Sequence, residues 1–209
     1  MIDFRLYLIT DRKLTADRYS LTASVEKALK GGVRAIQLRE KDLGTRELLT
    51  LAHKMRKLTE KYNARLFIND RFDIALAAGA DGVQLTQNSI PADAVRRVVK
   101  DKLMIGVSTH SLKEAKEAEK ARADFITLGP VYRTPSKLKY GKPVGIDILK
   151  TVCGKVNIPV FAIGGIKNNK IKEAKEAGAY GIAMISEIFG AEDIREKARE
   201  TVKGEFLKR

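Results

Sequence analysis

The stretch RLFINDRFDIALAAGADGVQLT, residues 65–86, contains the unit from which most of the chain is built. It begins with one short apolar run, RLFIN, and ends with another, GVQLT. Both runs are continuously hydrophobic rather than alternating, which is typical of a strand covered on both faces in a parallel sheet. Between them, LAAGADGV places a glycine where a helix ends and the chain reverses into the next strand. The stretch therefore predicts a β-α-β unit.

Apolar runs of this kind recur along the whole sequence. They are LYLIT (6–10), AIQLR (35–39), RLFIN (65–69), GVQLT (82–86), LMIGVS (103–108), FITLGPV (125–131), PVFAIGG (159–165) and GIAMIS (181–186). Amphipathic segments separate them, with apolar positions at intervals of three and four. We expect Thr45 to be the N-cap of the helix in residues 45–62, and a final helix to begin near Ala191.

Eight strand–helix units without a linker predict an α/β protein with a single closed (β/α)₈ barrel, one TIM-barrel domain over residues 1–209. Of the four clearest helix-to-strand junctions, three contain a glycine, whereas EKARADFI does not. The alternative is an open doubly wound sheet. It would usually have fewer strands, and no GxGxxG pattern follows the first run.

The composition is basic, with 40 Lys and Arg against 26 Asp and Glu and a formal net charge of +14. Nucleic acid and a polyanionic small substrate are both conceivable partners. Most basic residues alternate with acids on helical faces, and tryptophan is absent, so we expect no nucleic-acid binding.

No run approaches the roughly 20 apolar residues of a membrane span, and the N-terminus lacks signal-peptide features. We therefore expect a cytoplasmic protein without membrane contact, in which the lone Cys153 is a buried structural thiol.

Polar residues follow the predicted strands at the end where barrels of this kind carry their active sites. In strand order they are Thr10, Asp11 and Arg12; Gln37, Arg39, Glu40 and Lys41; Asn69, Asp70 and Arg71; Thr86, Gln87, Asn88 and Ser89; Ser108, Thr109 and His110; the long loop GPVYRTPSKLKYGKPVG; Gly164, Gly165 and Ile166; and Ile185 and Ser186. Taken singly, each has a simpler explanation: Asn69–Asp70 as a helix cap, or Arg39 paired with a rim carboxylate. Together they predict one polar rim.

Two anion sites are expected on this rim. Barrels often bind phosphate in the loops after their last two strands, and Gly165 allows the backbone to approach an anion closely near Ser186. Arg39, Lys41 and Lys137 indicate a second, diphosphate-sized site. Asp70 is well placed to hold Mg²⁺, which prefers carboxylate, water and phosphate oxygens.

Two further features of the rim are open to more than one interpretation. The loop after the sixth run is long enough to be a lid, although an ordinary surface connection would also explain it. His110 is a candidate proton-transfer group. Alternatively, its segment STHS serves only to cap the next helix through Ser111.

The chain resembles the thiamine phosphate synthase family and its TenI-type branch, nearly end to end. The resemblance rests on YLITD, QLREK, FINDRFDIALAAGADGVQL, IGVSTHSLKEAKEAEKARADFITLGPVYRTPSK, IPVFAIGGI and GAYGIAMIS. It implies a (β/α)₈ barrel that makes thiamine phosphate in thiamine biosynthesis. The synthases join hydroxymethylpyrimidine diphosphate to hydroxyethylthiazole phosphate or its carboxylate. Diphosphate leaves first, and the thiazole nitrogen then attacks the pyrimidine cation.

The resemblance also implies roles for individual residues. Arg39, Lys41, Asn69, Ser108 and Lys137 would hold the diphosphate, with Lys137 and Ser108 acting in catalysis beside His110. Gln37 would lie next to the pyrimidine, and Asp70 would bind Mg²⁺. The thiazole phosphate end would be held by Thr134, Ser136, Gly165, Ile185 and Ser186. The implied partners are therefore the two small phosphorylated substrates, and a homodimer is possible.

One segment departs from the family pattern. Synthases usually carry H-x-G-Q-E-D after the fourth strand, and its final Asp is a second metal ligand. Here Gln84 stands at the position of the His and Ser89 at that of the Asp. A neutral hydroxyl is a poorer Mg²⁺ ligand than a carboxylate, so Ser89 is a doubtful one, and Glu40 or Asp42 could replace it only in part. This segment is more like TenI, a thiazole tautomerase that needs no metal and uses the histidine at 110 as its base. A tautomerase and a non-catalytic regulatory paralogue are thus the alternatives to a Mg²⁺-dependent synthase, which the full set of cationic residues favours.

Overall fold

The computed structural model describes residues 2–134 and 142–204. Within them the strands are β1 (Leu6–Ile9), β2 (Ala35–Leu38), β3 (Arg65–Asn69), β4 (Gly82–Leu85), β5 (Met104–Thr109), β6 (Phe125–Leu128), β7 (Val160–Ile163) and β8 (Gly181–Met184). Each pairs in parallel with its sequence neighbours, and β1 also pairs with β8, so the sheet closes into a barrel. The predicted (β/α)₈ barrel is confirmed, and the open sheet is excluded.

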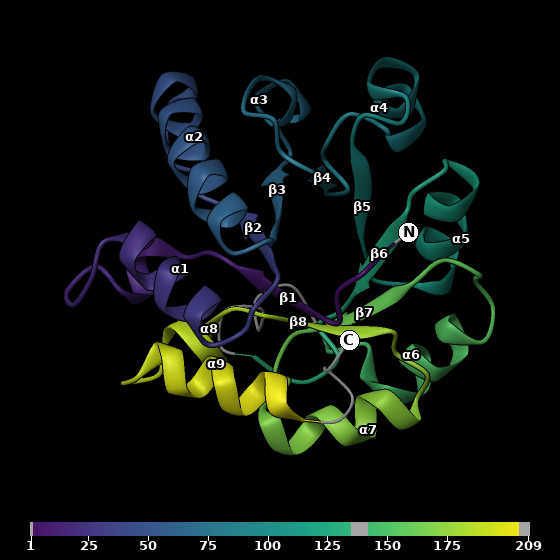
Figure 1. Ribbon diagram of the computed structural model, residues 1–209. Coiled ribbons are helices and arrows are strands. Elements are labelled where there is room, and N and C mark those ends of the chain that lie inside the picture. The colour runs from purple at the N-terminus through teal and green to yellow at the C-terminus, as the bar shows by residue number, and fades with distance from the viewer. Residues whose placement is uncertain (1, 135–141, 205–209) are drawn as a thin grey trace.

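Helices surround the strands on all sides (Figure 1). They are α1 (Leu21–Lys30), α2 (Thr45–Lys61), α3 (Phe72–Ala77), α4 (Ala92–Val99), α5 (Leu112–Lys120), α6 (Gly145–Cys153), α7 (Ile171–Glu176), α8 (Ser186–Phe189) and α9 (Ile194–Lys203), with short 3₁₀ turns η1 (Arg12–Leu14) and η3 (Asn168–Lys170). None of the helices in the described part of the chain is long and apolar enough to cross a membrane.

Two predicted helix boundaries were wrong. Thr45 is the first residue of α2 rather than its N-cap, because Gly44 takes the extended cap conformation and its N–H donates to the Glu47 side chain over 3.1 Å. The last helix begins at Ile194 rather than near Ala191, because the Asp193 side chain caps it by accepting from the Glu196 N–H over 3.0 Å.

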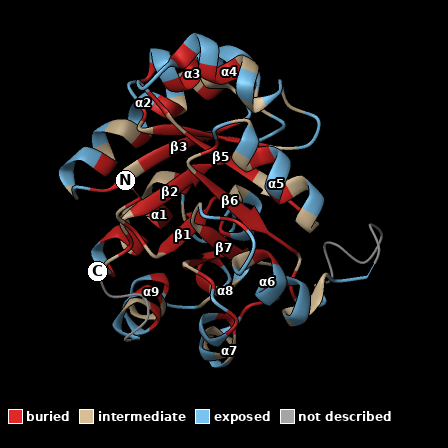
Figure 2. Ribbon diagram, turned by 90° about the vertical axis from the view of Figure 1, so that its right-hand side faces the viewer, coloured by how far each residue is buried: buried red, intermediate tan, exposed pale blue. Residues whose placement is uncertain are grey.

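The apolar core has two parts, and the buried residues lie along the strands and the inner faces of the helices (Figure 2). The larger part fills the layer between strands and helices. The smaller part fills the barrel itself with aromatic rings, of which Tyr7, Phe67, Phe125 and Phe161 are fully buried. Their ring centroids lie 5.2–6.1 Å apart, mostly edge to face. The barrel is therefore a packed core rather than a pore.

At the end of the barrel where the strands begin, two aspartates hold neighbouring strands and helices together through hydrogen bonds and ion pairs. Asp81, just before β4, accepts from the Leu66 N–H over 2.8 Å and pairs with Arg56 of α2 at 2.6 Å. Asp124, just before β6, likewise accepts from the Ile105 N–H over 2.6 Å and pairs with Arg96 of α4 at 2.6 Å. This recurring contact ties a helix and two strands together.

Candidate active site

The inward positions of the strands change from aromatic to polar towards the carboxyl end of the barrel. Side chains on a strand alternate between its two faces, so residues two apart share a face. In β3, Phe67 is followed on the inward face by Asn69, and in β6 Phe125 is followed by Thr127. Ser108 follows Gly106 in the same way on β5. The aromatic core thus ends under a polar layer, which forms the floor of the barrel mouth.

Two hydrogen-bonded groups make up this polar layer. Gln37 of β2 donates through Nε2 to Oδ1 of Asn69 over 3.0 Å. Gln84 of β4 donates through Nε2 to Oγ of Ser108 over 3.1 Å and to Oγ1 of Thr127 over 3.5 Å. The Oε1 atoms of both glutamines are buried and have no hydrogen-bond partner within the described residues. Buried polar atoms of this kind are rare in proteins, and a binding site is one explanation for them.

Gln84 and Thr127 were not among the predicted site residues. The signal for Thr127 was available in the sequence, because it lies two positions after Phe125 on a strand that runs towards the polar rim. Gln84 was noticed only as a departure from the family pattern. Its inward direction follows from its pairing with Asn69 on β3 and with Gly106 on β5.

The charged cluster after β2 contains two carboxylates with structural roles. Glu40 is buried, and its carboxylate accepts from Thr10 Oγ1 over 2.7 Å and from Nη1 of Arg12 over 3.2 Å. Arg12 also forms a two-pronged pair with Asp42, with N–O distances of 2.6 and 2.9 Å. This pair lowers the pKa of Asp42 through the hydrogen bonds from Arg12. Neither carboxylate is therefore free to replace a metal ligand at position 89.

The two cations of the same cluster are left without such partners. Within the described residues, no hydrogen bond or ion pair involves the side chains of Arg39 and Lys41. Arg39 is half-buried and Lys41 is exposed. Among the described residues Arg39 thus forms no pair with a rim carboxylate, and its neighbours Glu40 and Asp42 are both bound by Arg12. The cluster presents an uncompensated positive charge at the end of β2.

Asp70 and Ser89 differ in whether their side chains are free. Asp70 follows β3 with a positive φ of 67°, and its exposed carboxylate makes no hydrogen bond to a described residue. Neither Asp70 nor Asn69 caps α3, whose N-cap is Arg71. Ser89 Oγ accepts from the Thr86 N–H over 2.7 Å and lies 3.0 Å from Thr86 Oγ1. Ser89 therefore closes the turn after β4, and of the two only Asp70 offers an unengaged oxygen ligand.

His110 lies between the end of β5 and the N-cap of α5, and a carboxylate holds it. Glu114 Oε2 accepts from the His110 backbone N–H over 2.9 Å and lies 3.0 Å from His110 Nδ1. Ser111 caps the helix, with its Oγ accepting from the Glu114 N–H over 3.2 Å. The capping interpretation of STHS is confirmed for Ser111. The histidine ring is oriented through Nδ1 and its side chain is 48% exposed, which leaves Nε2 available for proton exchange.

The loop after β6 packs against the Gly-Gly turn after β7. The Tyr132 N–H donates to the Gly164 carbonyl over 3.0 Å. A side chain at Gly165 would collide with Tyr132, since an added Cβ would lie 2.7 Å from its Cβ, and the φ of Gly165 is 68°. The glycines thus allow two loops to meet closely. Thr134 is half-buried on this loop, whereas Ser136 and Lys137 lie outside the described residues.

The last two predicted residues lie at the junction after β8. Ile185 is half-buried and is the N-cap of the short helix α8, which begins at the exposed Ser186. The first amides of a helix have no partner inside it and point outward. Gly165, Ile185 and Ser186 follow neighbouring strands, because β7 and β8 are paired from Phe161 to Ile163. The structure thus brings three of the five residues predicted to hold the thiazole phosphate to adjacent strand ends.

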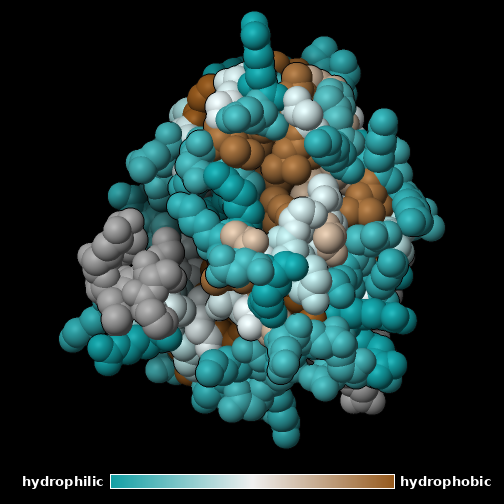
Figure 3. Space-filling view, turned by 90° about the vertical axis from the view of Figure 1, so that its left-hand side faces the viewer, coloured by the Kyte–Doolittle hydropathy of each residue, from teal (hydrophilic) through white to brown (hydrophobic). Residues whose placement is uncertain are grey.

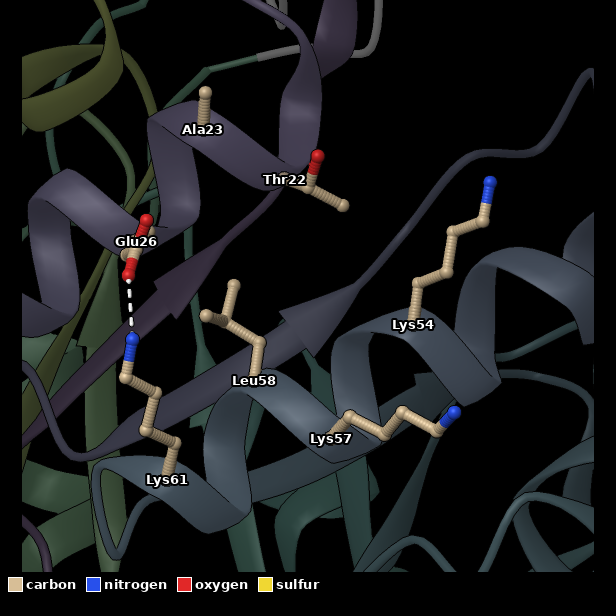
Figure 4. A pocket seen from close by; sticks show the side chains of 7 residues that line it. All are labelled: Thr22, Ala23, Glu26, Lys54, Lys57, Leu58 and Lys61. Atoms are coloured by element: carbon tan, nitrogen blue, oxygen red, sulfur yellow. Dashed lines mark hydrogen bonds and ion pairs between the residues drawn. The ribbon is translucent and has the colours of Figure 1, made fainter.

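A shallow groove lies elsewhere, on the outer faces of α1 and α2. It has a volume of about 430 Å³ and is lined by Thr22, Ala23, Glu26, Lys54, Lys57, Leu58 and Lys61 (Figure 4). On this side of the molecule hydrophobic atoms are surrounded by hydrophilic side chains (Figure 3). Lys61 and Tyr62 both contact Glu26 here, at 3.2 and 2.9 Å. None of the predicted site residues lines this groove, so the barrel mouth is the candidate active site.

Comparison with known proteins identifies relatives that span the whole barrel. The family model described as thiamine monophosphate synthase matches residues 6–188. A thiamine-phosphate synthase of Halalkalibacterium halodurans is 45% identical over 93% of this chain and 92% of its own length. A protein of Geobacter sulfurreducens that bears the same name with a provisional qualifier is 56% identical over 95% and 92%. The structure of a thiamine phosphate pyrophosphorylase from Pyrococcus furiosus superposes with a TM-score of 0.88 and 41% identity, covering 98% of each chain.

Proposed function

The chain belongs to the thiamine monophosphate synthase family, and we propose that it is itself a thiamine-phosphate synthase, a transferase of thiamine biosynthesis. It would join hydroxymethylpyrimidine diphosphate to hydroxyethylthiazole phosphate, or to the carboxylate of that thiazole, with release of diphosphate. The observation that carries this proposal is the pair of unpartnered cations, Arg39 and Lys41, beside a polar barrel floor. A substrate with several negative charges would neutralise them.

The diphosphate substrate would lie over β2, β3 and β5. Arg39 offers a planar fork for phosphate oxygens and Lys41 a point charge, while Asn69 and Ser108 contribute neutral polar groups. Lys137, on the loop after β6, would complete this set. Gln37 would lie beside the pyrimidine; its Oε1 has no hydrogen-bond partner among the described residues, so it keeps an acceptor for an amino group of the ring.

The thiazole phosphate would lie on the other side of the mouth. The backbone at Gly165, Ile185 and Ser186 supplies amides after β7 and β8, where barrels commonly bind phosphate. Thr134 and Ser136 would contribute hydroxyl groups from the loop after β6. Two anion sites on opposite sides of one barrel mouth would place the thiazole nitrogen opposite the carbon that bears the diphosphate.

The reaction exchanges one bond for another at the pyrimidine methylene carbon. The carbon–oxygen bond to diphosphate breaks, and its electron pair leaves with the diphosphate. The resulting pyrimidine cation then accepts the lone pair of the thiazole nitrogen, which forms the new carbon–nitrogen bond. Arg39, Lys41 and Lys137 would favour departure by stabilising negative charge on the leaving oxygens. Ser108 would hold the same oxygens through its hydroxyl group.

A Mg²⁺ ion is expected to accompany the diphosphate. Mg²⁺ is usually held by one or two carboxylates together with water and substrate phosphate oxygens. Asp70 fits this requirement because its carboxylate is exposed and free of hydrogen bonds to described residues. When bound, the ion would supply charge neutralisation to the leaving group. Ser89 does not fit as a second ligand, since it closes its own turn. Diphosphate oxygens and water would therefore supply most of the ligands.

A second candidate function is the metal-independent thiazole tautomerase. It is favoured by the contact between His110 Nδ1 and Glu114, because a carboxylate at Nδ1 orients the ring and leaves Nε2 to accept a proton. In that case His110 would move a proton on the thiazole ring, and the reaction would need no metal ligand at position 89. The cations at Arg39 and Lys41 would then have no diphosphate to bind.

One assay with two readouts tests the proposal. The purified protein is given hydroxymethylpyrimidine diphosphate, the thiazole phosphate carboxylate tautomers and Mg²⁺, and the products are separated by chromatography. We expect thiamine phosphate to form and its formation to stop when EDTA removes the metal. If the tautomers interconvert in EDTA and no thiamine phosphate appears, the chain is a tautomerase. The variant His110→Ala would then abolish that interconversion.

A further inference from the structure

Three side chains in the floor of the barrel mouth form a connected set on neighbouring strands. Gln84 Nε2 donates to Ser108 Oγ over 3.1 Å and to Thr127 Oγ1 over 3.5 Å, and Thr127 Oγ1 donates to Ser108 Oγ over 3.4 Å. Gln84 is 1% exposed and Thr127 is 3% exposed. Ser108 is only half-buried and therefore lies at the boundary between the buried floor and the open mouth.

The hydrogen-bond capacities of the three groups fix the direction of the Ser108 proton. A serine hydroxyl has one proton to donate and two lone pairs that accept. Gln84 Nε2 can only donate, and Thr127 donates as well, so both lone pairs of Ser108 are occupied. Within the described residues, no acceptor takes the Ser108 proton. That proton is therefore available only to a group that enters the mouth.

The orientation of the Gln84 amide agrees with this direction. Its oxygen lies against Gly106, where an added Cβ would be only 2.4 Å from Oε1. In the reverse orientation an NH₂ group would occupy that place, buried and without an acceptor. A stranded buried donor is rarer than a carbonyl oxygen that lacks a partner. The amide thus directs its nitrogen towards Ser108.

We propose that Gln84 and Thr127 are positioning residues that hold the Ser108 hydroxyl as a hydrogen-bond donor to the diphosphate of the substrate. This inference rests on the proposed synthase function, which places the diphosphate at Ser108. It assigns roles to two residues that do not themselves touch the substrate. The hydroxyl would be set in its donating direction before the substrate arrives, so little rotational freedom would be lost on binding.

A double-mutant cycle separates positioning from a merely structural role. Inorganic diphosphate with Mg²⁺ is titrated by calorimetry into the wild type, Ser108→Ala, Gln84→Met and the double variant. We expect Ser108→Ala to weaken binding roughly 10- to 100-fold, the range for a hydrogen bond to a charged group. Gln84→Met keeps the length of the side chain and loses the donor, and we expect a loss of roughly 3- to 10-fold. The double variant should bind no more weakly than Ser108→Ala alone. Losses that multiply would overturn the inference.

A second pair of variants guards against misfolding at position 84. Thr127→Val removes the hydroxyl at nearly constant volume, whereas Thr127→Ser retains it. We expect Thr127→Val to weaken diphosphate binding and Thr127→Ser to restore the affinity. Equal affinities in these two variants would also count against the inference.

Steady-state kinetics distinguish failure of the inference from failure of the proposed function. In Gln84→Met, the KM for the pyrimidine diphosphate should rise while the KM for the thiazole phosphate stays within about twofold, because only the diphosphate would contact Ser108. If the wild type makes no thiamine phosphate, the synthase function fails and the inference fails with it. If the wild type is active but both KM values change together, only the inference fails.

Discussion

The Thr10 hydroxyl donates to the buried carboxylate of Glu40 over 2.7 Å, and this bond joins the end of β1 to the end of β2. The Thr10 oxygen in turn accepts from the Arg39 N–H over 2.9 Å. The Oε1 atom of Glu40 also accepts a hydrogen bond from the backbone N–H of Arg12 over 3.2 Å. The contact thus sets the direction in which the chain leaves β2 and delivers Arg39 and Lys41 to the barrel mouth.

Glu40→Ala should destabilise the protein clearly. The substitution leaves a buried threonine hydroxyl and a guanidinium without their acceptor, and breaking a buried charged contact commonly costs about 3–5 kcal/mol. We expect a loss of about 2–4 kcal/mol in the free energy of unfolding, because Arg12 keeps Asp42 as a partner. Urea titration followed by circular dichroism measures it. Asp42→Ala is the matched control, since it removes the exposed partner of the same arginine and should change stability little. Equal losses in both variants would contradict this account.

The partners of the charged side chains in REKD (residues 39–42) could not be predicted from that segment alone. The sequence indicates that four charged residues follow a buried strand, but not which of them bind one another. The decisive partners, Thr10 and Arg12, come from the end of a different strand, about 30 positions earlier. Only the closure of the barrel brings them together. Glu40 and Asp42 were therefore predicted as partial replacements for a metal ligand, although Arg12 binds both of them.

The fold itself was predictable because its signals are local. Continuous apolar runs mark the strands, and glycines such as Gly79, with a φ of 64°, mark the helix-to-strand junctions. Helix starts were less predictable, because the capping residue depends on individual hydrogen bonds. The Gly44 N–H donates to the Glu47 side chain, and the Asp193 side chain accepts from the Glu196 N–H. The junction that lacks glycine keeps the same backbone geometry. There Arg122 has a φ of 63°, in the left-handed region that favours glycine.

Arg122→Gly should therefore stabilise the protein. A left-handed conformation costs a residue with a Cβ about 1–2 kcal/mol, part of which glycine returns through greater freedom in the unfolded chain. We expect a gain of roughly 0.5–1 kcal/mol, read as a higher urea midpoint with an unchanged slope. Gly79→Ala at the equivalent junction is the matched control and should lower the midpoint. An added Cβ at Gly79 meets nothing within 4 Å, so its cost would come from the backbone alone. A lower midpoint in Arg122→Gly would refute the argument.

Cys153 should react slowly with alkylating reagents. The thiol was predicted to be buried, but it is only partly buried at the end of α6, and this burial still raises the pKa of the thiol to about 11. Since the thiolate is the reactive form, only about one molecule in a thousand would be reactive at pH 8. We expect iodoacetamide to modify the native protein at least roughly 100-fold more slowly than the urea-unfolded chain. Mass spectrometry of timed samples measures both rates.

The pH dependence of this reaction provides the check. Folding favours the neutral thiol, so its contribution to stability is complete below the pKa of the unfolded chain, near 9, and is lost as the pH rises towards about 11. The rate of modification of the native protein should accordingly keep rising between pH 9 and 11, where that of the unfolded chain levels off. A plateau near pH 9 in the native protein would be inconsistent with the raised pKa.

Ser89→Asp should lower the Mg²⁺ concentration that the reaction requires. An aspartate can accept the Thr86 N–H as the serine does, and its second carboxylate oxygen would be free to bind the ion. We expect the Mg²⁺ concentration at half-maximal rate to fall roughly tenfold, as measured by titration of thiamine phosphate formation. Ser89→Asn is the matched control, because it keeps the turn but adds no charge. If the two variants respond identically to Mg²⁺, position 89 is not at the metal site.

The candidate site was predicted in part, and the boundary between success and failure is physical. Residues at the carboxyl end of a strand or just after it, such as Asn69 and Asp70, were found because the carboxyl ends of parallel strands form one rim. Gln84 and Thr127 lie inside the strands, where a polar residue between apolar ones reads as a minor interruption. Their importance depends on contacts across β4, β5 and β6, which only the register of the barrel defines.

Arg39→Ala and Lys41→Ala should each weaken the binding of the diphosphate substrate and leave the binding of the thiazole phosphate nearly unchanged. Each removes a cation that has no protein partner among the described residues, so the folded structure loses little. A charged hydrogen bond to phosphate commonly contributes about 1.5–3 kcal/mol, and we therefore expect the KM for the pyrimidine diphosphate to rise roughly 10- to 100-fold. The KM for the thiazole phosphate should stay within about twofold. Steady-state kinetics with each substrate varied in turn measure both values.

Lys57→Ala provides the control for net charge. Lys57 is exposed on the outer face of α2, in the groove away from the barrel mouth, and its loss changes the total charge by the same amount. Long-range attraction of a polyanion depends on total charge and is screened by salt, whereas direct contact with the diphosphate depends on position. We expect Lys57→Ala to behave as the wild type at 0.15 M salt. If it raised the KM as much as Lys41→Ala, the basic residues would act through the overall field, and the site at the end of β2 would have to be abandoned.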